Sequence, residues 1–124
     1  MADENNTLLY VDDESINLML FDKLFSKNYN VITAESGFKA LDLMQKHPEI
    51  KLIFSDMKMP EMNGIEFIKK AQQQYSDKCY YIISGYEIND EIDEALTKGL
   101  ISDYFKKPFN MVELNNAIQK NLEQ

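Results

Sequence analysis

Polar side chains that could perform chemistry follow four apolar runs of the sequence. They are Asp12 and Asp13 after TLLYV, Asp56 after KLIFS, Ser84 after CYYII, and Lys107 after DYFK. If these runs are strands of one open parallel sheet, their carboxyl ends share an edge, where ligands bind in such folds. Three carboxylates, a hydroxyl and an ammonium would then converge, which predicts a bound cation or a reaction at that edge.

Three neighbouring carboxylates limit the chemistry of such an edge. Two carboxylates about 4 Å apart repel by roughly 4 kcal/mol at an effective dielectric of about 20. Three carboxylates therefore raise one another's pKa or require a compensating cation. Mg²⁺ suits this set because it prefers oxygen ligands and keeps water and phosphate oxygens beside one or two carboxylates. An Asp carboxylate is also a nucleophile that forms acyl phosphates, and Lys107 would add a fixed positive charge. The residue types therefore predict Mg²⁺-dependent phosphoryl transfer.

Each of these residues also has a purely structural interpretation. Asp12 and Asp13 could cap the helix that follows and favour its dipole. Asp56 could be a turn residue ahead of the segment MPEMNG. Ser84 could be an ordinary turn residue, and Lys107 a solvated surface lysine. Their joint placement after neighbouring strands favours one site over several unrelated turns.

The elements that would position these residues alternate regularly along the chain. Short runs rich in Val, Ile, Tyr, Phe and Leu, as strands are, lie at 7–11, 30–33, 51–55, 79–84 and 103–106. Segments with helical spacing follow each run. A strand followed by a helix, five times over, predicts an α/β fold in which one parallel sheet has helices on both faces.

Each helical segment carries an apolar stripe, which we expect to face the sheet. The stripes comprise Ile16, Met19, Leu20, Phe21, Leu24 and Phe25; Phe38, Leu41 and Met44; Ile65, Phe67, Ile68 and Ala71; Ile88, Ile92, Ala95 and Leu96; and Met111, Leu114, Ile118 and Leu122. Gly99 is expected to end the fourth helix, and Asn110 to cap the last.

Composition bounds the class of protein. The chain has 124 residues, the size of one domain, and 44% hydrophobic residues, an ordinary fraction for a globular core. Its 13 basic and 21 acidic residues give a net charge of −8, which argues against direct nucleic-acid binding. The single cysteine excludes an internal disulfide. The sequence has neither a secretory signal nor an apolar stretch of the ~20 residues that a membrane span needs. We therefore expect a soluble, cytoplasmic protein without membrane contact.

Four short motifs together resemble those of one known family. They are the acidic pair in YVDDE, the segment SDMKMPEMNG, the hydroxyl-bearing ISG, and DYFKKPF. In this order and at this spacing, the chain resembles the receiver domain of two-component response regulators over nearly its whole length, and is similar to stand-alone chemotaxis-type regulators. The resemblance implies a flavodoxin-like (βα)5 sandwich with strand order 2-1-3-4-5. It also implies a single receiver domain over residues 1–124, with no effector domain in this chain.

The resemblance assigns roles to the acidic residues and their neighbours. Asp56 would accept the phosphoryl group and would therefore be the modified residue. Asp12, Asp13 and Asp56 would bind Mg²⁺, or Mn²⁺ in its place, together with the backbone carbonyl of Lys58. Gly64 would shape the turn after the acceptor.

The resemblance also assigns the residues that respond to phosphorylation. Ser84 would be the switch hydroxyl, and Tyr104 the switch aromatic. Lys107 would be the catalytic lysine, followed by Pro108 through a bond that is commonly cis in this family. Its neighbour Lys106 would be excluded from the site, because adjacent side chains of a strand point to opposite faces.

Two features of the sequence would tune the receiver. Family members commonly read Gly-Ala-x-x-Tyr before the fifth strand, whereas residues 99–104 read GLISDY, one residue longer. The extra residue lies beside the expected output surface and would affect how Tyr104 couples to it. Lys58 and Tyr86 occupy the positions two beyond the acceptor and the switch hydroxyl, which in this family tune attack of water. A long cation and a bulky ring there predict slow self-dephosphorylation.

The resemblance implies a signalling function. The phosphoryl group would come from a sensor histidine kinase or a histidine phosphotransfer protein. It would switch the face built from the fourth helix, fifth strand and fifth helix toward a downstream protein target, not toward nucleic acid. The chain would be no enzyme beyond its own phosphorylation and dephosphorylation, and would be a monomer or a weak phosphorylation-dependent dimer.

Other classes of protein are weighed against this interpretation. A flavin carrier would need a Ser/Thr/Gly-rich phosphate loop where this chain has DDESIN. A haloacid-type phosphatase would need two Asp separated by one residue, whereas Asp12 and Asp13 are adjacent. Two alternatives within the same fold stay open at this point: a receiver-like scaffolding domain that is never phosphorylated, and a receiver fragment of a larger regulator or hybrid kinase.

Overall fold

A computed structural model describes residues 6–85, 89–108 and 110–122. The strands are β1 (Thr7–Val11), β2 (Asn30–Ala34), β3 (Ile50–Asp56), β4 (Cys79–Ser84) and β5 (Asp103–Lys106). The helices are α1 (Ser15–Phe25), α2 (Gly37–Lys46), α3 (Gly64–Gln74), α4 (Asp90–Thr97) and α5 (Met111–Leu122). The predicted alternation of strand and helix is confirmed, and every strand lies within one residue of its predicted range.

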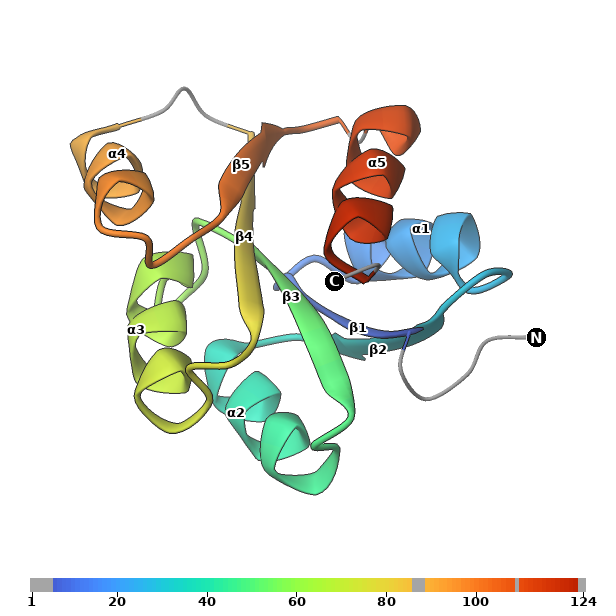
Figure 1. The fold of residues 1–124 in the computed structure, drawn as a ribbon, viewed down its shortest axis with the longest axis horizontal. Coiled ribbons are helices and arrows are strands. Elements are labelled where there is room, and N and C mark those ends of the chain that lie inside the picture. The colour runs from blue at the N-terminus through green and yellow to red at the C-terminus, as the bar shows by residue number, and fades with distance from the viewer. Residues whose placement is uncertain (1–5, 86–88, 109, 123–124) are drawn as a thin grey trace.

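The strands form one parallel sheet in the order β2-β1-β3-β4-β5. The helices α1 and α5 cover one face, and α2, α3 and α4 cover the other (Figure 1). The flavodoxin-like order and the two helical layers are therefore confirmed. Because all the strands run the same way, their carboxyl ends meet at one edge of the sheet.

Side-chain alternation along the strands builds two cores, one under each layer of helices. In β1, Leu8 and Tyr10 pack toward α1 and α5, while Leu9 and Val11 pack toward the other three helices. The cause is the two-residue period of a strand. All of β1 is buried, as expected for a strand covered on both faces.

The helix α1 buries a different stripe from the one we predicted. Phe21 and Phe25 are buried as expected, but Ile16, Met19 and Leu20 are 71%, 55% and 42% exposed. The sequence of α1 carries two apolar stripes at helical spacing, and the prediction merged them. Residues three or four positions apart share a helix face. Phe21 and Phe25 lie on one face of α1, and Ile16 and Leu20 lie on another. When the first face packs against the sheet, the second is left exposed to solvent.

Smaller corrections apply to two other helices. Phe38 in α2 is 55% exposed and Met111 in α5 is 46% exposed, so neither belongs to the buried stripe predicted for its helix. Both lie in the first turn of their helices. The predicted end of α4 is confirmed by the left-handed backbone of Gly99 (φ 75°). The predicted cap of α5 is confirmed by Asn110, whose side chain accepts a hydrogen bond from the Glu113 amide.

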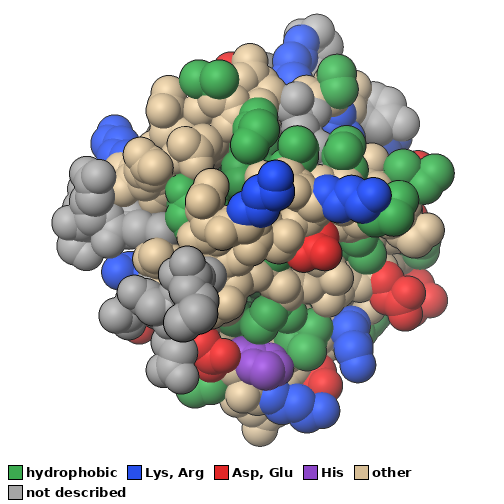
Figure 2. Space-filling model, turned by 90° about the vertical axis from the view of Figure 1, so that its right-hand side faces the viewer, with side chains coloured by type: hydrophobic (Ala, Val, Ile, Leu, Met, Phe, Trp, Pro, Cys, Tyr) green, Lys and Arg blue, Asp and Glu red, His purple; other side chains and the backbone are tan. Residues whose placement is uncertain are grey.

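The surface is mixed in character. Figure 2 shows Lys, acidic and hydrophobic side chains interspersed over the face at the right of Figure 1. Within the described part of the chain, no helix has both the length and the apolar content that crossing a bilayer requires.

Candidate functional site

The carboxyl ends of β1 and β3 lie side by side and bring the three predicted carboxylates together. Val11 pairs with Ser55, so Asp12 follows one strand where Asp56 ends the next. Asp12, Asp13 and Asp56 each present an oxygen, and these oxygens all lie within 4.8 Å of one another. Asp12 and Asp56 are buried, whereas Asp13 is exposed. The strand order thus creates the charge cluster that the sequence predicted.

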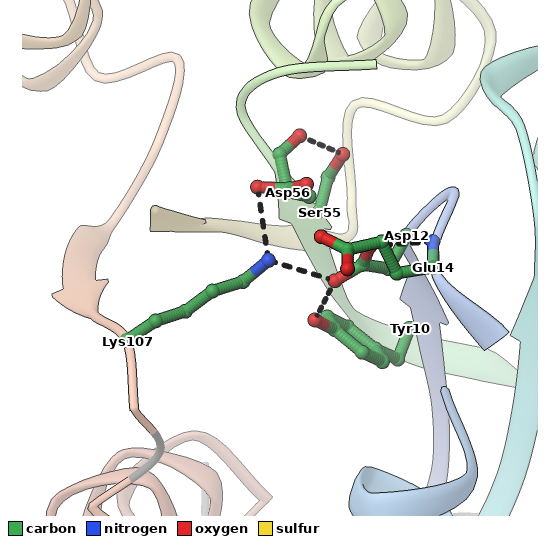
Figure 3. Close-up of polar contacts among 6 residues, drawn as sticks. All are labelled: Tyr10, Asp12, Glu14, Ser55, Asp56 and Lys107. Atoms are coloured by element: carbon green, nitrogen blue, oxygen red, sulfur yellow. Dashed lines mark hydrogen bonds and ion pairs between the residues drawn. The ribbon is translucent and has the colours of Figure 1, made fainter. Parts of the chain in front are cut away.

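Asp12 is fully buried, and three donors hold its carboxylate (Figure 3). Its Oδ2 accepts hydrogen bonds from the Tyr10 hydroxyl at 2.5 Å and from Nζ of Lys107 at 2.9 Å. Its Oδ1 accepts a hydrogen bond from the backbone amide of Glu14 at 2.9 Å. A buried carboxylate needs such partners to offset the loss of water, and each oxygen of Asp12 has at least one.

Asp56 is also buried, but it has fewer compensating contacts. The structure gives it an ion pair from Nζ of Lys107 to Oδ1 at 3.4 Å. Burial raises the pKa of Asp56 from an ordinary 3.8 to about 6; the charge of Asp12 acts in the same direction, and Lys107 opposes both. An added cation beside Asp56 would therefore favour its ionised form.

Lys107 joins the two buried carboxylates (Figure 3). Burial by itself lowers the pKa of Lys107, but the hydrogen bond to Asp12 and the charges of Asp56 and Asp12 outweigh burial and raise the pKa above its ordinary value. Its ammonium is therefore a permanent positive charge. Lys106 is exposed, and the Lys107–Pro108 bond is cis; the choice of Lys107 over its neighbour therefore agrees with the geometry.

The turn after Asp56 depends on a glycine. The Gly64 amide donates to the carbonyl of Met57 at 2.8 Å, and a Cβ at Gly64 would lie 2.3 Å from the carbonyl oxygen of Asp56. The helix α3 then starts with a capping box, in which the side chains of Asn63 and Glu66 each accept a hydrogen bond from the other's backbone amide. The backbone after Asp56 is thereby fixed.

An open cavity lies over the cluster. Its volume is about 450 Å³, and it is lined by Asp13, Glu14, Asp56, Lys58, Gly85 and Lys107. A hard divalent cation needs oxygen ligands and room for its water ligands. Three converging carboxylates at an open cavity provide both, so the donor set fits Mg²⁺.

The predicted switch residues lie near this edge on β4 and β5. Ser84 ends β4, is buried, and lies opposite Lys106 in the sheet. Tyr104 lies opposite Ile82 and is half-buried against the core under α2, α3 and α4. Tyr86, to which we assigned a shielding role, lies outside the described residues.

The extra residue of the GLISDY segment is taken up in the turn before β5. Gly99 has positive φ, the Leu100 amide donates to the carbonyl of Ala95 at 2.9 Å, and the Ser102 amide donates to the carbonyl of Tyr80 at 2.8 Å. The strand β5 then pairs with β4 without interruption. The added length therefore leaves the alternation of β5 side chains intact.

Sequence reasoning missed one residue of this site, Tyr10. We treated it as a core residue of the first strand, and its ring does stack on Phe21 with a centroid distance of 4.5 Å. Its hydroxyl nevertheless contacts Asp12. The signal was present, because residues two apart on a strand share a face and a buried tyrosine hydroxyl needs a partner. Burial, followed by the neighbouring Asp12, raises the pKa of Tyr10 well above its ordinary value, which keeps the hydroxyl protonated as a donor.

The strand order and the acidic cluster at the carboxyl edge of the sheet define the class of fold and site to be compared with known proteins. Residues 8–119 match the family model of the response regulator receiver domain. The chain therefore belongs to the receiver domain family of two-component response regulators. Domains of this family are signalling modules rather than general enzymes, typically bind Mg²⁺ at an acidic pocket, and interact with histidine kinases and phosphotransfer proteins.

Individual relatives agree with this assignment. The chain is 33% identical over 120 residues to sporulation initiation phosphotransferase F of Bacillus subtilis, covering 95% of this chain and 94% of that protein. The structure of the Vibrio cholerae chemotaxis protein CheY4 superposes with a TM-score of 0.81 at 31% identity, covering 98% of each chain. The hydrogenase transcriptional regulatory protein HoxA of Cupriavidus necator is 27% identical over 123 residues, and this chain spans 99% of its own length but 25% of that protein.

The comparisons decide between the classes of protein weighed from the sequence. The flavin carrier and the haloacid-type phosphatase are not supported, because the family match covers the strands and all three carboxylates. A scaffolding domain without phosphorylation is not favoured. Relatives occur both as short chains and as segments of longer regulators.

Proposed function

We propose that this chain takes a phosphoryl group onto the carboxylate of Asp56 from a histidine phosphate, and that the phosphorylated form contacts a downstream protein differently. One observation carries the proposal: Nζ of Lys107 lies 2.9 Å from Oδ2 of Asp12 and 3.4 Å from Oδ1 of Asp56. A fixed cation between two buried carboxylates, at an open cavity, supports the transfer of a group that adds negative oxygens to this place.

The transfer would be an in-line displacement at phosphorus. A carboxylate oxygen of Asp56 attacks the phosphorus, and a bond between them forms as the bond to the donor's imidazole nitrogen breaks. The leaving nitrogen takes the bonding electron pair and then a proton from solvent. Lys107 is already beside Asp56, so its ammonium can pair with a phosphoryl oxygen after a small movement.

We propose that Asp12, Asp13, Asp56 and the backbone carbonyl of Lys58 hold Mg²⁺. Mn²⁺ would serve in its place, since carboxylate and carbonyl oxygens suit both ions. When bound, the ion would neutralise phosphoryl oxygens. The raised pKa of Asp56 supports this proposal, because a cation near that carboxylate favours the ionised, nucleophilic form. The only reactions catalysed would be phosphorylation of Asp56 and its hydrolysis by water.

The switch would run from Asp56 to the face built from α4, β5 and α5. We propose that the Ser84 hydroxyl and Lys107 turn toward the phosphoryl group, and that Tyr104 moves into the space that Ser84 leaves. The half-buried position of Tyr104 supports two alternative packings of its ring. Phosphorylation would then shift the population between two states of this face.

We propose that a protein donor contacts α1 beside the acidic site. Ile16, Met19 and Leu20 are exposed there, and α1 starts at Ser15, directly after the acidic turn. Exposed apolar groups next to a polar site favour a protein contact. Replacing Ile16 and Leu20 with Ser should slow transfer from a phosphohistidine protein and leave labelling by a small phosphodonor unchanged. Phe38→Ser is the control, because Phe38 on α2 has an exposure between those of Ile16 and Leu20, and it should affect neither.

We propose that residues 1–124 form one receiver unit that works in the cytoplasm. It would be a monomer or a weak phosphorylation-dependent dimer, and its target would be a protein rather than nucleic acid. A second candidate is a receiver that forms one segment of a longer regulator. The match to the HoxA regulator supports this second candidate, because this chain corresponds to 25% of that protein's length.

Mass measurement after incubation with a small phosphodonor tests the proposal. The wild type should gain one phosphoryl group when Mg²⁺ is present and none when the metal is chelated. Asp56→Asn should gain none in either condition, while Asp77→Asn, an exposed position outside the site, should behave as the wild type does. Full labelling of Asp56→Asn would contradict the assignment of the acceptor.

A further inference from the structure

Tyr10 is a buried tyrosine whose hydroxyl is bound to the acidic site rather than to backbone. Its side chain is fully buried, and its hydroxyl donates to Oδ2 of Asp12 at 2.5 Å (Figure 3). The ring stacks on Phe21 with an interplanar angle of 21°. The strand β1 and this stack therefore position the ring, and with it the hydroxyl.

The contacts of Asp12 show what this hydroxyl contributes. An ionised carboxylate has about four lone-pair positions. Among the described residues, Tyr10 and Lys107 fill both positions on Oδ2, and the Glu14 amide fills one of the two positions on Oδ1. The oxygen that remains available to a cation is therefore Oδ1, and the donors on Oδ2 determine which way it points.

The two donors on Oδ2 differ in mobility. Lys107 is a long side chain that also contacts Asp56, so movement toward a group added at Asp56 would weaken its contact with Asp12. If Tyr10 lacked its hydroxyl, Oδ2 of a fully buried carboxylate would depend on Lys107 alone. Removing a partner from a buried charge is costly, so Asp12 would then retain Lys107.

We propose that Tyr10 is a positioning residue for phosphoryl transfer: its hydroxyl holds Oδ2 of Asp12, which keeps Oδ1 directed at the cation and releases Lys107 for the phosphoryl group. This inference rests on the proposed function, and it adds a residue that acts through Asp12 and Lys107 without touching the phosphoryl group. Groups that hydrogen-bond to metal ligands commonly contribute about 10-fold or more to metal affinity.

Magnesium titration of two matched variants tests the inference. Tyr10→Phe keeps the ring and its stack on Phe21 and removes only the hydroxyl. Tyr80→Phe is the control, because Tyr80 is also buried and its hydroxyl donates to the backbone carbonyl of Tyr75 at 2.7 Å, away from the acidic cluster. We expect calorimetric titration with MgCl₂ to give a Kd about 10-fold higher for Tyr10→Phe and an unchanged Kd for Tyr80→Phe. At saturating Mg²⁺, labelling by a small phosphodonor should still be slower in Tyr10→Phe alone.

The outcomes separate this inference from the proposed function. If the wild type binds Mg²⁺ and is labelled while Tyr10→Phe matches it in both measurements, the inference is wrong and the proposed function stands. Equal losses in Tyr10→Phe and Tyr80→Phe would also overturn the inference, since any buried hydroxyl would then have the same effect. A wild type that neither binds Mg²⁺ nor accepts a phosphoryl group would overturn the proposed function.

A measurement on the wild type keeps the test valid if Tyr10→Phe fails to fold. The Tyr10 hydroxyl proton should be protected from solvent exchange, and its proton resonance should shift when MgCl₂ is added. The Tyr80 hydroxyl resonance should stay in place. A Tyr10 resonance that does not respond to Mg²⁺ would overturn the inference.

Discussion

Replacing Asp56 with Asn should stabilise the metal-free protein, although it destroys the proposed acceptor. The substitution removes one of three negative charges whose oxygens lie within 4.8 Å of one another. It keeps the shape of the side chain and an oxygen that can still accept from Lys107. The variant therefore isolates the free energy of holding this charge in the folded state.

The magnitude follows from the pKa of Asp56. Burial and the neighbouring Asp12 raise that pKa from 3.8 to about 6, and each pKa unit corresponds to about 1.4 kcal/mol, so ionisation in the folded state is unfavourable by about 3 kcal/mol. Solvent in the cavity screens part of this cost, which leaves about 1.5 kcal/mol. Asp56→Asn should therefore raise the free energy of unfolding by about 1.5 kcal/mol near neutral pH.

The gain should depend on pH with a defined sign. The folded-state pKa of Asp56 lies above the unfolded value, so the folded wild type binds a proton more tightly than the unfolded chain. Stability that the protonated carboxyl contributes is fully present below about pH 4 and is lost as the pH rises through about 6. Asn does not titrate, so the advantage of the variant should be small below about pH 4, grow up to about pH 6, and then stay level.

Urea unfolding in the presence of a chelator, repeated across this pH range, measures the difference. Asp77→Asn serves as the control, because Asp77 is exposed and lies outside the acidic cluster; its effect should be small at every pH. Adding Mg²⁺ should stabilise the wild type more than Asp56→Asn, because the wild type binds the ion with one more carboxylate. A variant that is no more stable than the wild type, or an advantage that is the same at all pH values, would refute the reasoning.

Three further predictions concern neighbouring positions. Gly64→Ala should lower the free energy of unfolding, measured with urea, by about 2 kcal/mol, because the added Cβ would lie 2.3 Å from the Asp56 carbonyl oxygen. Gly85→Ala is the control and should leave that free energy nearly unchanged, because a Cβ at Gly85 would have no atom within 4 Å among the described residues. Lys107→Met should slow labelling by a small phosphodonor about 100-fold because it removes the cation beside Asp56, whereas Lys106→Met should not; equal effects would contradict the assignment. Lys58→Ala should shorten the lifetime of the phosphorylated protein, measured as loss of the added mass, because Lys58 lines the same cavity as Asp56 and its removal would open that cavity to water. An unchanged lifetime would refute the proposed shielding.

The agreement between sequence and structure is closest where local chemistry decides the outcome. The apolar runs of β3 and β4 predict strands covered on both faces, and the strand ends place Asp12 and Asp56 at one edge. The separation of Lys107 from Lys106 follows from the two-residue period of a strand. The left-handed Gly99 follows from the preference of helix ends for glycine.

The disagreements arise where a local pattern has two solutions. Ile16 and Leu20 share a helical spacing with each other, and so do Phe21 and Phe25, so the pattern alone does not say which pair is buried. The sheet decides, because only one side of α1 can pack against it, and that side carries Phe21 and Phe25. Exposure of the other stripe provides the apolar surface that we assign to donor contact.

The sequence by itself determined the order of the elements, the family, and the residues that carry charge at the sheet edge. The reason is that these depend on residue type and on periods of two or 3.6 residues along the chain. Only the tertiary structure decided which oxygen of Asp12 each donor holds, and that Tyr10 is one of those donors. The Lys107 contact joins segments that are far apart in the chain, and the Tyr10 contact depends on how its ring packs against Phe21, so tertiary packing sets both.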